Sequence, residues 1–107
     1  MGRKDDAQKA LAQAFEKANA IQMYVYARTL QRQGNPKRAF ELYPEVSKKD
    51  PNHWISHLAQ ARLASNAGDF STATKEMQAS ITGAPDPQKP FLEPMLKRLS
   101  NKEDINK

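Results

Sequence analysis

Apolar residues between positions 20 and 100 recur at intervals of three and four, the spacing of one face of an α-helix. The apolar runs are separated by short breaks that contain glycine, proline, asparagine or aspartate, the residues that end and begin helices. We expect about six helices and no β-strand. The pattern therefore predicts an all-α chain.

The first complete pair of predicted helices occupies residues 20–52. Its first helix stops at Gly34, which suits a helix C-cap. Asn35 can cap the second helix, with Pro36 at the first position, where a missing N–H costs nothing. That helix stops before Pro51. The predicted core-facing residues are Met23, Tyr26, Ala27 and Leu30, followed by Ala39, Phe40, Leu42, Tyr43 and Val46.

A 34-residue shift of the sequence superimposes this pair on a second one, predicted over residues 53–86. Gly34 falls on Gly68 and Pro51 on Pro85, so the turns coincide. Internal repetition at this period indicates a stack of similar helix pairs. The other identities are Ile21 with Ile55, Ala27 with Ala61, Arg28 with Arg62, and Ala39 with Ala73.

The flanks of the two repeats read as partial units of a single domain over residues 1–107. Residues 5–18 predict a leading helix, and residues 87–100 predict a capping helix with a polar outer side. Residues 101–107 predict a polar tail. The apolar residues of the two flanking helices are Ala7, Leu11, Ala14, Phe15 and Ala18, then Phe91, Leu92, Met95, Leu96 and Leu99.

Pro44 lies inside the predicted helix that begins at Pro36. A proline there removes one helical hydrogen bond and bends the helix. The second repeat has Gln78 at the same place, so the repeat does not require proline. We expect a local bend near residues 40–44 and no break, because packing on both sides can hold a kinked helix.

The repeat resembles the tetratricopeptide repeat, whose pattern is W-x2-L-G-x2-Y, then A-x3-F, then P, on a 34-residue period. The resemblance implies a right-handed α-solenoid of antiparallel helix pairs. The second repeat departs from the pattern at His57 and Gln60, where Trp54 and Leu58 are expected to supply the packing. The matching residues are Met23, Tyr26, Ala27, Leu30, Ala39, Tyr43 and Pro51, then Ala61, Ala64, Ala73, Met77 and Pro85.

A second resemblance covers nearly the whole chain. The run from "ANAIQMYVYARTLQRQG" to "KRLSNKEDIN" is similar to the C-terminal repeats of a group of bacterial proteins of unknown function, mostly exported. It implies that the chain is a fragment or a stand-alone relative. The start "MGRKDDAQKA" predicts no signal peptide, which leaves two compartments open: cytoplasmic as the chain stands, or periplasmic or exported as part of such a parent.

The tetratricopeptide resemblance implies a non-catalytic adaptor or scaffold that binds a peptide or protein segment on its concave face. The first helix of each pair lines that face in the family. The corresponding residues here, called the candidate groove, are Ile21, Tyr24, Val25, Arg28, Gln31, Arg32, Ile55, Leu58, Ala59, Arg62, Ser65 and Asn66.

Arg28 and Arg62 lie one repeat apart, so stacking would place them side by side. Guanidinium groups bind carboxylates bidentately, which favours an acidic or C-terminal peptide segment. The competing interpretation is two solvated arginines whose stems cover apolar neighbours. Tyr24 is the aromatic residue expected on the groove, where it suits a binding hot spot. The family's carboxylate clamp uses Lys and Asn, absent at the equivalent positions Tyr24, Arg28 and Ala59.

His53 and His57 have a spacing that can bind metal on a helix, but no cysteine or nearby carboxylate completes a site. A packing or capping role is the favoured interpretation. No motif of a nucleophile, a phosphate-binding loop or a zinc protease occurs, so we expect no enzyme activity and no cofactor.

The net charge of +5 leaves binding to RNA or another polyanion as an alternative function. It is the weaker alternative because the basic residues are scattered along the chain. Lys48 and Lys49 complement the dipole at the end of their own helix. Another alternative is a structural module that forms homodimers through residues 5–18, whose apolar side lacks a partner in the repeat pattern. No apolar run has the length of a membrane span.

Overall fold

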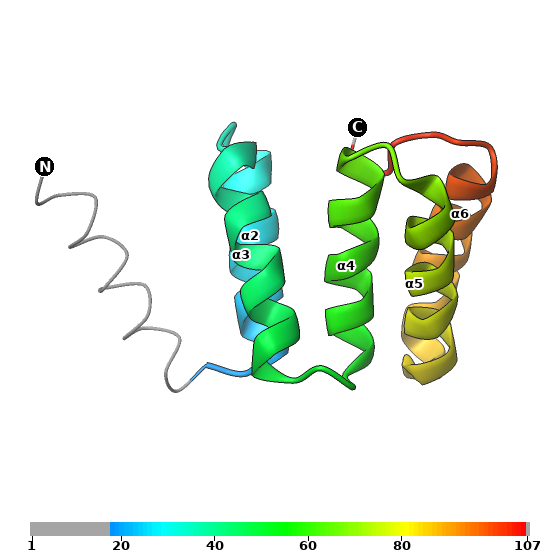
Figure 1. The fold of residues 1–107 in the computed structure, drawn as a ribbon. Helices are drawn as coiled ribbons and strands as arrows, with labels where there is room; N and C mark the ends of the chain where they lie inside the picture. Colours follow the sequence, from blue (N-terminus) through cyan, green and yellow to red (C-terminus); the bar gives the residue numbers. More distant parts are fainter. Residues whose placement is uncertain (1–17, 107) are drawn as a thin grey trace, which may run out of the picture.

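The computed structural model describes residues 18–106, and this part of the chain is all-helical (Figure 1). No strand occurs within it, which confirms the all-α part of the predicted fold class. The leading helix predicted over residues 5–18 lies, apart from Ala18, outside the described residues. The helices are α2 (Ala20–Arg32), α3 (Pro36–Lys49), α4 (Trp54–Asn66), α5 (Phe70–Gly83) and α6 (Lys89–Ser100), with a 3₁₀ turn η1 (Asp86–Gln88) before α6.

The helices form a repeat-like row. α2 and α3 lie side by side at one end, α4 occupies the middle, and α5 and α6 lie on the other side of it (Figure 1). α4 contacts α2, α3 and α5, so three helices cover much of its surface. This central position decides how much of α4 can be reached from solvent.

The turns that follow α2 and α4 share one geometry at positions 34 residues apart. Gly34 has φ +85° and Gly68 has φ +79°, a left-handed conformation that glycine adopts without a steric penalty. In each turn the glycine N–H bonds to the carbonyl three residues back, and the next N–H bonds to the carbonyl five residues back. The sequence repeat is therefore also a repeat of backbone structure at these turns.

Side chains cap the helix N-terminus at three of the predicted boundaries. Asn19 and Gln22 form a reciprocal capping box at α2, and Asp69 accepts from the N–H of Thr72 at α5. His53 caps α4 by accepting from the N–H of Ile55, which confirms the capping role expected for it. Asn35 occupies the N-cap of α3 but makes no side-chain cap bond.

α3 continues through Pro44 as a single helix from Pro36 to Lys49. The expectation of an unbroken helix is therefore confirmed. α6 likewise contains an internal proline, Pro94, in addition to Pro90 in its first turn. Both helices bury one face against neighbours, and such packing can hold a helix that lacks one backbone hydrogen bond.

The core is formed by the buried faces of all five helices. The paired alanines of the repeat are fully buried, which is the close helix approach that small residues permit. Tyr26, predicted to face the core, is 40% exposed, whereas the neighbouring Tyr24 is 8% exposed. The prediction was wrong for Tyr26 because the buried arc of α2 is turned toward Tyr24. The large buried residues include Met23, Leu42, Tyr43, Val46, Ile55, Leu58, Met77, Leu92 and Leu99.

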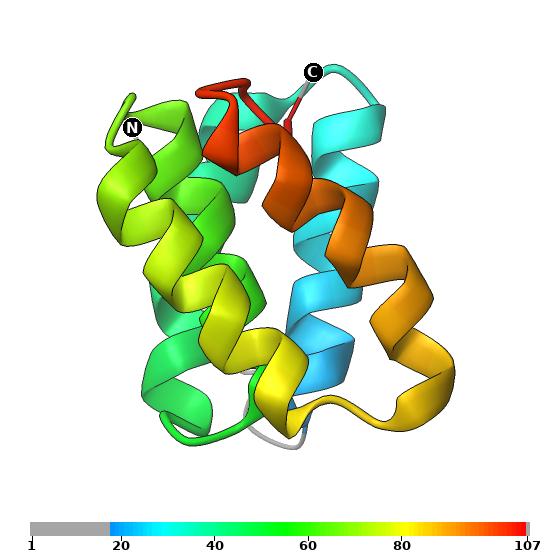
Figure 2. The same cartoon turned by 90° about the vertical axis from the view of Figure 1, so that its right-hand side faces the viewer.

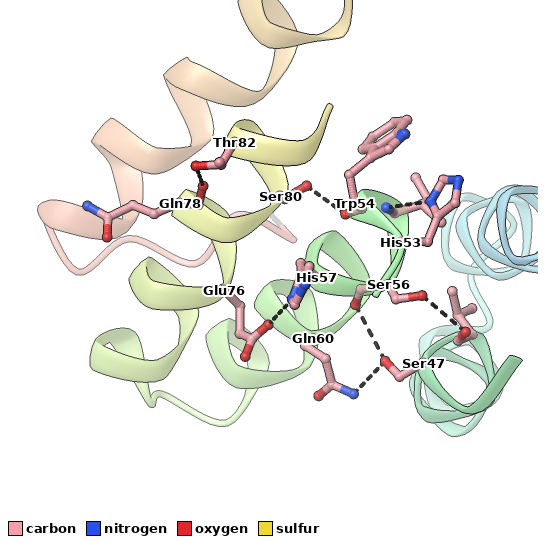
Figure 3. Close-up of polar contacts among 12 residues, drawn as sticks. Ser47, His53, Trp54, Ser56, His57, Gln60, Glu76, Gln78, Ser80 and Thr82 are labelled. Atoms are coloured by element: carbon pink, nitrogen blue, oxygen red, sulfur yellow. Dashed lines mark hydrogen bonds and ion pairs between the residues drawn. The ribbon is translucent and has the colours of Figure 1, made fainter. Parts of the chain in front are cut away.

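Polar contacts connect α4 to α3 and α5 where the second repeat departs from the tetratricopeptide pattern (Figure 3). The Gln60 amide donates to the Ser47 hydroxyl at 2.6 Å. His57 Nδ1 lies 2.8 Å from a carboxylate oxygen of Glu76. Hydrogen bonds to neighbouring helices thus satisfy both half-buried polar side chains, which occupy positions expected to be apolar.

Candidate functional site

The α2 part of the candidate groove is accessible except at Tyr24. The prediction that Tyr24 is a hot spot on this surface was wrong, because its side chain is buried and its hydroxyl accepts from Arg62. Ile21 and Val25 are 41% and 55% exposed, and Arg32 is exposed as well. Arg28 and Gln31 are half-buried. Exposed apolar side chains beside arginines suit a surface that binds a protein segment.

The α4 part of the candidate groove is closed in this structure. Its five buried members were expected to face outward, and only Asn66 is exposed. The reason is the central position of α4, together with the chain that follows α6, which returns across it. The buried residues are Ile55, Leu58, Ala59, Arg62 and Ser65.

The C-terminal segment (residues 101–106), predicted as a polar tail, is bound to the helices. It turns after α6 through Lys102, whose φ of 59° reverses the chain, and it runs toward the end of α2 (Figure 2). Ile105 is only 5% exposed, while residues 101–103 remain exposed. The segment therefore docks through one apolar side chain and the polar groups on either side of it.

Arg62 lies at the centre of the contact between α4, α2 and the C-terminal segment. Its Nε donates to the Tyr24 hydroxyl at 2.7 Å, and one terminal nitrogen donates to the Ile105 carbonyl at 3.3 Å. Longer contacts reach the Asn106 amide oxygen and the sulfur of Met95. These four acceptors are neutral, and the side chain is buried.

Ser65 and the backbone of α4 hold the C-terminal segment by specific hydrogen bonds. The Ser65 hydroxyl donates to the Asp104 carboxylate at 2.8 Å and accepts from the Ile105 N–H at 3.0 Å. The Asn106 amide nitrogen donates to the carbonyl of Arg62 at 2.9 Å. Asp104 also accepts from the N–H of Asn106, which fixes the segment in a tight local turn.

Gln31 links the C-terminal segment to α2 and α3. Its amide nitrogen donates to Asn106 at 3.2 Å, and its amide oxygen accepts from Tyr43 and Arg28, each at 2.8 Å. Arg28 and Arg62 thus belong to one hydrogen-bond network but do not form the simple two-rung ladder expected from the repeat. One guanidinium is half-buried and the other buried, so the two sites are not equivalent.

Within this network, the Tyr43 hydroxyl has a shifted pKa. Burial raises its pKa above the usual value, and the nearby Tyr24 adds to the rise. The charges of Arg62 and Arg28 act in the opposite direction. Tyr43 is therefore held as a neutral hydroxyl that donates to Gln31.

The role of residues 104–106 was missed from the sequence. The available signal was Ile105, the only apolar residue after Leu99, set between Asp104 and Asn106. A single apolar residue has no periodicity, so helical patterning could not assign it to the core.

The two histidines do not share a site. His53 caps α4, and His57 faces Glu76 of α5. Among the described residues, no group of three or more His, Cys, Asp and Glu side chains is arranged to hold a metal ion. Within residues 18–106, no helix combines the length and hydrophobicity needed to cross a bilayer.

The network offers a bound chain both donors and acceptors. The side chains of Arg62 and Gln31 donate hydrogen bonds to carbonyl oxygens. The Ser65 hydroxyl both donates and accepts a hydrogen bond, and the backbone carbonyl of Arg62 accepts one. These are the groups that recognise a peptide backbone and short polar side chains. The chain matches no protein-family model, no curated protein and no solved structure.

Proposed function

We propose that the chain is a non-catalytic interaction module that binds a segment of another protein on the face formed by α2 and α4. In this proposal the helices form a right-handed, tetratricopeptide-like solenoid of antiparallel pairs, and this face is the concave one. The shared turn geometry of Gly34 and Gly68 supports the solenoid.

The observation that carries the proposal is the C-terminal segment itself. A short, non-helical piece of polypeptide lies against α4 and α2, and it is held by Gln31, Arg62 and Ser65. All three are members of the candidate groove. The surface therefore has the chemistry to bind a short, non-helical peptide.

The exposed part of α2 is where a partner would extend beyond this contact. Ile21 and Val25 supply apolar area, and Arg28 and Arg32 supply positive charge, which favours an acidic segment. Self-association through residues 5–18 stays a prediction, because these residues, apart from Ala18, lie outside the described part of the chain.

The proposal is tested by site-specific photo-crosslinking in the cell that produces the chain. A photoreactive phenylalanine analogue replaces Val25 on α2 or, as the matched control, Gln78 on α5; both native residues are exposed. We expect one dominant protein adduct from position 25 and none from position 78. The purified partner is then measured against the full chain by calorimetry.

In the calorimetric step, Val25→Glu should weaken binding at least tenfold, because it removes apolar contact and adds a charge that repels an acidic segment. Gln78→Glu, which adds the same charge on α5, should change binding less than twofold. Arg28→Ala is preferred to Arg62→Ala, since the buried Arg62 also supports the fold. Equal effects of the two glutamate variants would assign the binding surface elsewhere.

A further inference from the structure

The contacts of residues 104–106 define a recognition pattern more specific than a general peptide surface. Ser65 pairs with both the side chain of Asp104 and the backbone of Ile105. Asn106 accepts from Gln31 and donates to the Arg62 carbonyl, so its position requires a carboxamide with both functions. Ile105, between them, is the buried apolar anchor.

A simple seal over the core would not need this arrangement. An apolar side chain at position 62 could cover the core without burying a guanidinium, and replacing buried charges by apolar groups is often stabilising. Instead, Arg62 points its donors at the Ile105 carbonyl and the Asn106 side chain. The contacts of Arg62 therefore depend on the conformation and the sequence of the bound segment.

The C-terminal segment is also attached in a way that permits release. It follows α6 through Lys102, which occupies the left-handed region that residues other than glycine rarely adopt. Of its side chains, only that of Ile105 is buried. Segments with few buried apolar contacts open at a lower free energy than the helical core.

We propose that Gln31, Arg62 and Ser65 form a recognition site for a partner segment of the form Asx–aliphatic–Asn, and that residues 104–106 occupy this site in cis. This inference rests on the proposed function and specifies the class of its ligand. The partner segment displaces the chain's own segment, which acts as a competitor tethered at high effective concentration.

The experiment titrates ¹⁵N-labelled full chain with a synthetic peptide, SNKEDINK, the sequence of residues 100–107. The receptor carries Ile105→Asp, which weakens docking of its own segment. We expect saturable shifts at the Ser65 amide and the Arg62 Nε–H, with an affinity at least tenfold higher than the wild-type chain shows for the same peptide. The matched control receptor is Glu103→Gln, an exposed position, which should behave like wild type.

Peptide variants test the recognition pattern. A peptide with aspartate in place of isoleucine should lose binding, because the anchor is gone. A peptide with the exposed glutamate replaced by glutamine should bind within twofold of the parent. Asn106→Ala is a second receptor that removes hydrogen bonds without burying a charge, and it replaces Ile105→Asp where that variant does not fold.

A folded receptor whose Ser65 and Arg62 signals do not move with the peptide would overturn the inference and show that the segment is only a structural seal. Equal binding of the isoleucine and aspartate peptides would also overturn it. The photo-crosslinking at position 25 is independent of this peptide. If the peptide does not bind but a partner is still captured at position 25, the recognition pattern is refuted and the proposed function is not.

Discussion

At the scale of single residues, the same amino acid takes different roles at equivalent positions of the two repeats. Arg28 is half-buried on α2 and bonds to Gln31 of the same helix. Arg62 is buried on the central helix and bonds to α2 and to the C-terminal segment. The sequence predicted both positions as one set, because periodicity does not reveal which helix lies in the middle of the stack.

Tyr43 gives a prediction about alkaline stability. Because burial raises its pKa in the folded chain, the neutral hydroxyl is favoured by folding. Its contribution is complete below the unfolded pKa of about 10 and is lost as the pH rises above that value. Tyr43→Phe should therefore lose less stability than wild type between about pH 9.5 and 11.5.

The measurement for Tyr43 is the free energy of unfolding from urea titrations across this pH range. Tyr26→Phe is the matched control, because it removes the hydroxyl of a tyrosine that is 40% exposed and retains Tyr43. This control should lose stability as wild type does. Parallel curves for wild type and Tyr43→Phe would show that the Tyr43 hydroxyl does not contribute to the alkaline loss.

At the scale of elements, the sequence predicted the described helices well. Glycine and proline at the boundaries, with stripes at helical spacing between them, place α2 to α6 within a few residues of their observed ends. Local chemistry sets these boundaries, so one sequence is sufficient to find them. Burial on α4 and docking of residues 101–106 depend on contacts between distant segments, which local patterns do not contain.

Pro44 gives a prediction at this scale. Within α3 it cannot donate a hydrogen bond to the carbonyl four residues earlier. Pro44→Ala should restore that bond and raise the free energy of unfolding by about 1 kcal/mol, after the greater freedom of the unfolded chain is counted.

The control for this prediction is Pro36→Ala. Pro36 occupies the first turn of α3, where its missing N–H has no helical acceptor. The variant should lower the free energy of unfolding by up to about 1 kcal/mol, because alanine gives the unfolded chain more conformational freedom than proline does. Both variants are compared with wild type in urea, and a loss of stability in Pro44→Ala would show that the packing of α3 depends on the proline.

At the scale of the whole molecule, one network joins α2, α3, α4 and the C-terminal segment. Tyr24, Gln31 and Tyr43 connect the first helix pair to Arg62 and Asn106, which are far away in sequence. The described residues therefore form one helical body to which residues 104–106 are hydrogen-bonded.

The most direct test of this account is amide hydrogen exchange of the full wild-type chain, measured at increasing urea concentration. The Ile105 N–H, which bonds to Ser65, should be protected, and its protection should disappear at lower urea than that of the Ala59 amide in α4. That result would show that the C-terminal segment is docked in the folded chain and is released before α4 unfolds. An unprotected Ile105 amide, or one that exchanges only when α4 unfolds, would contradict the account.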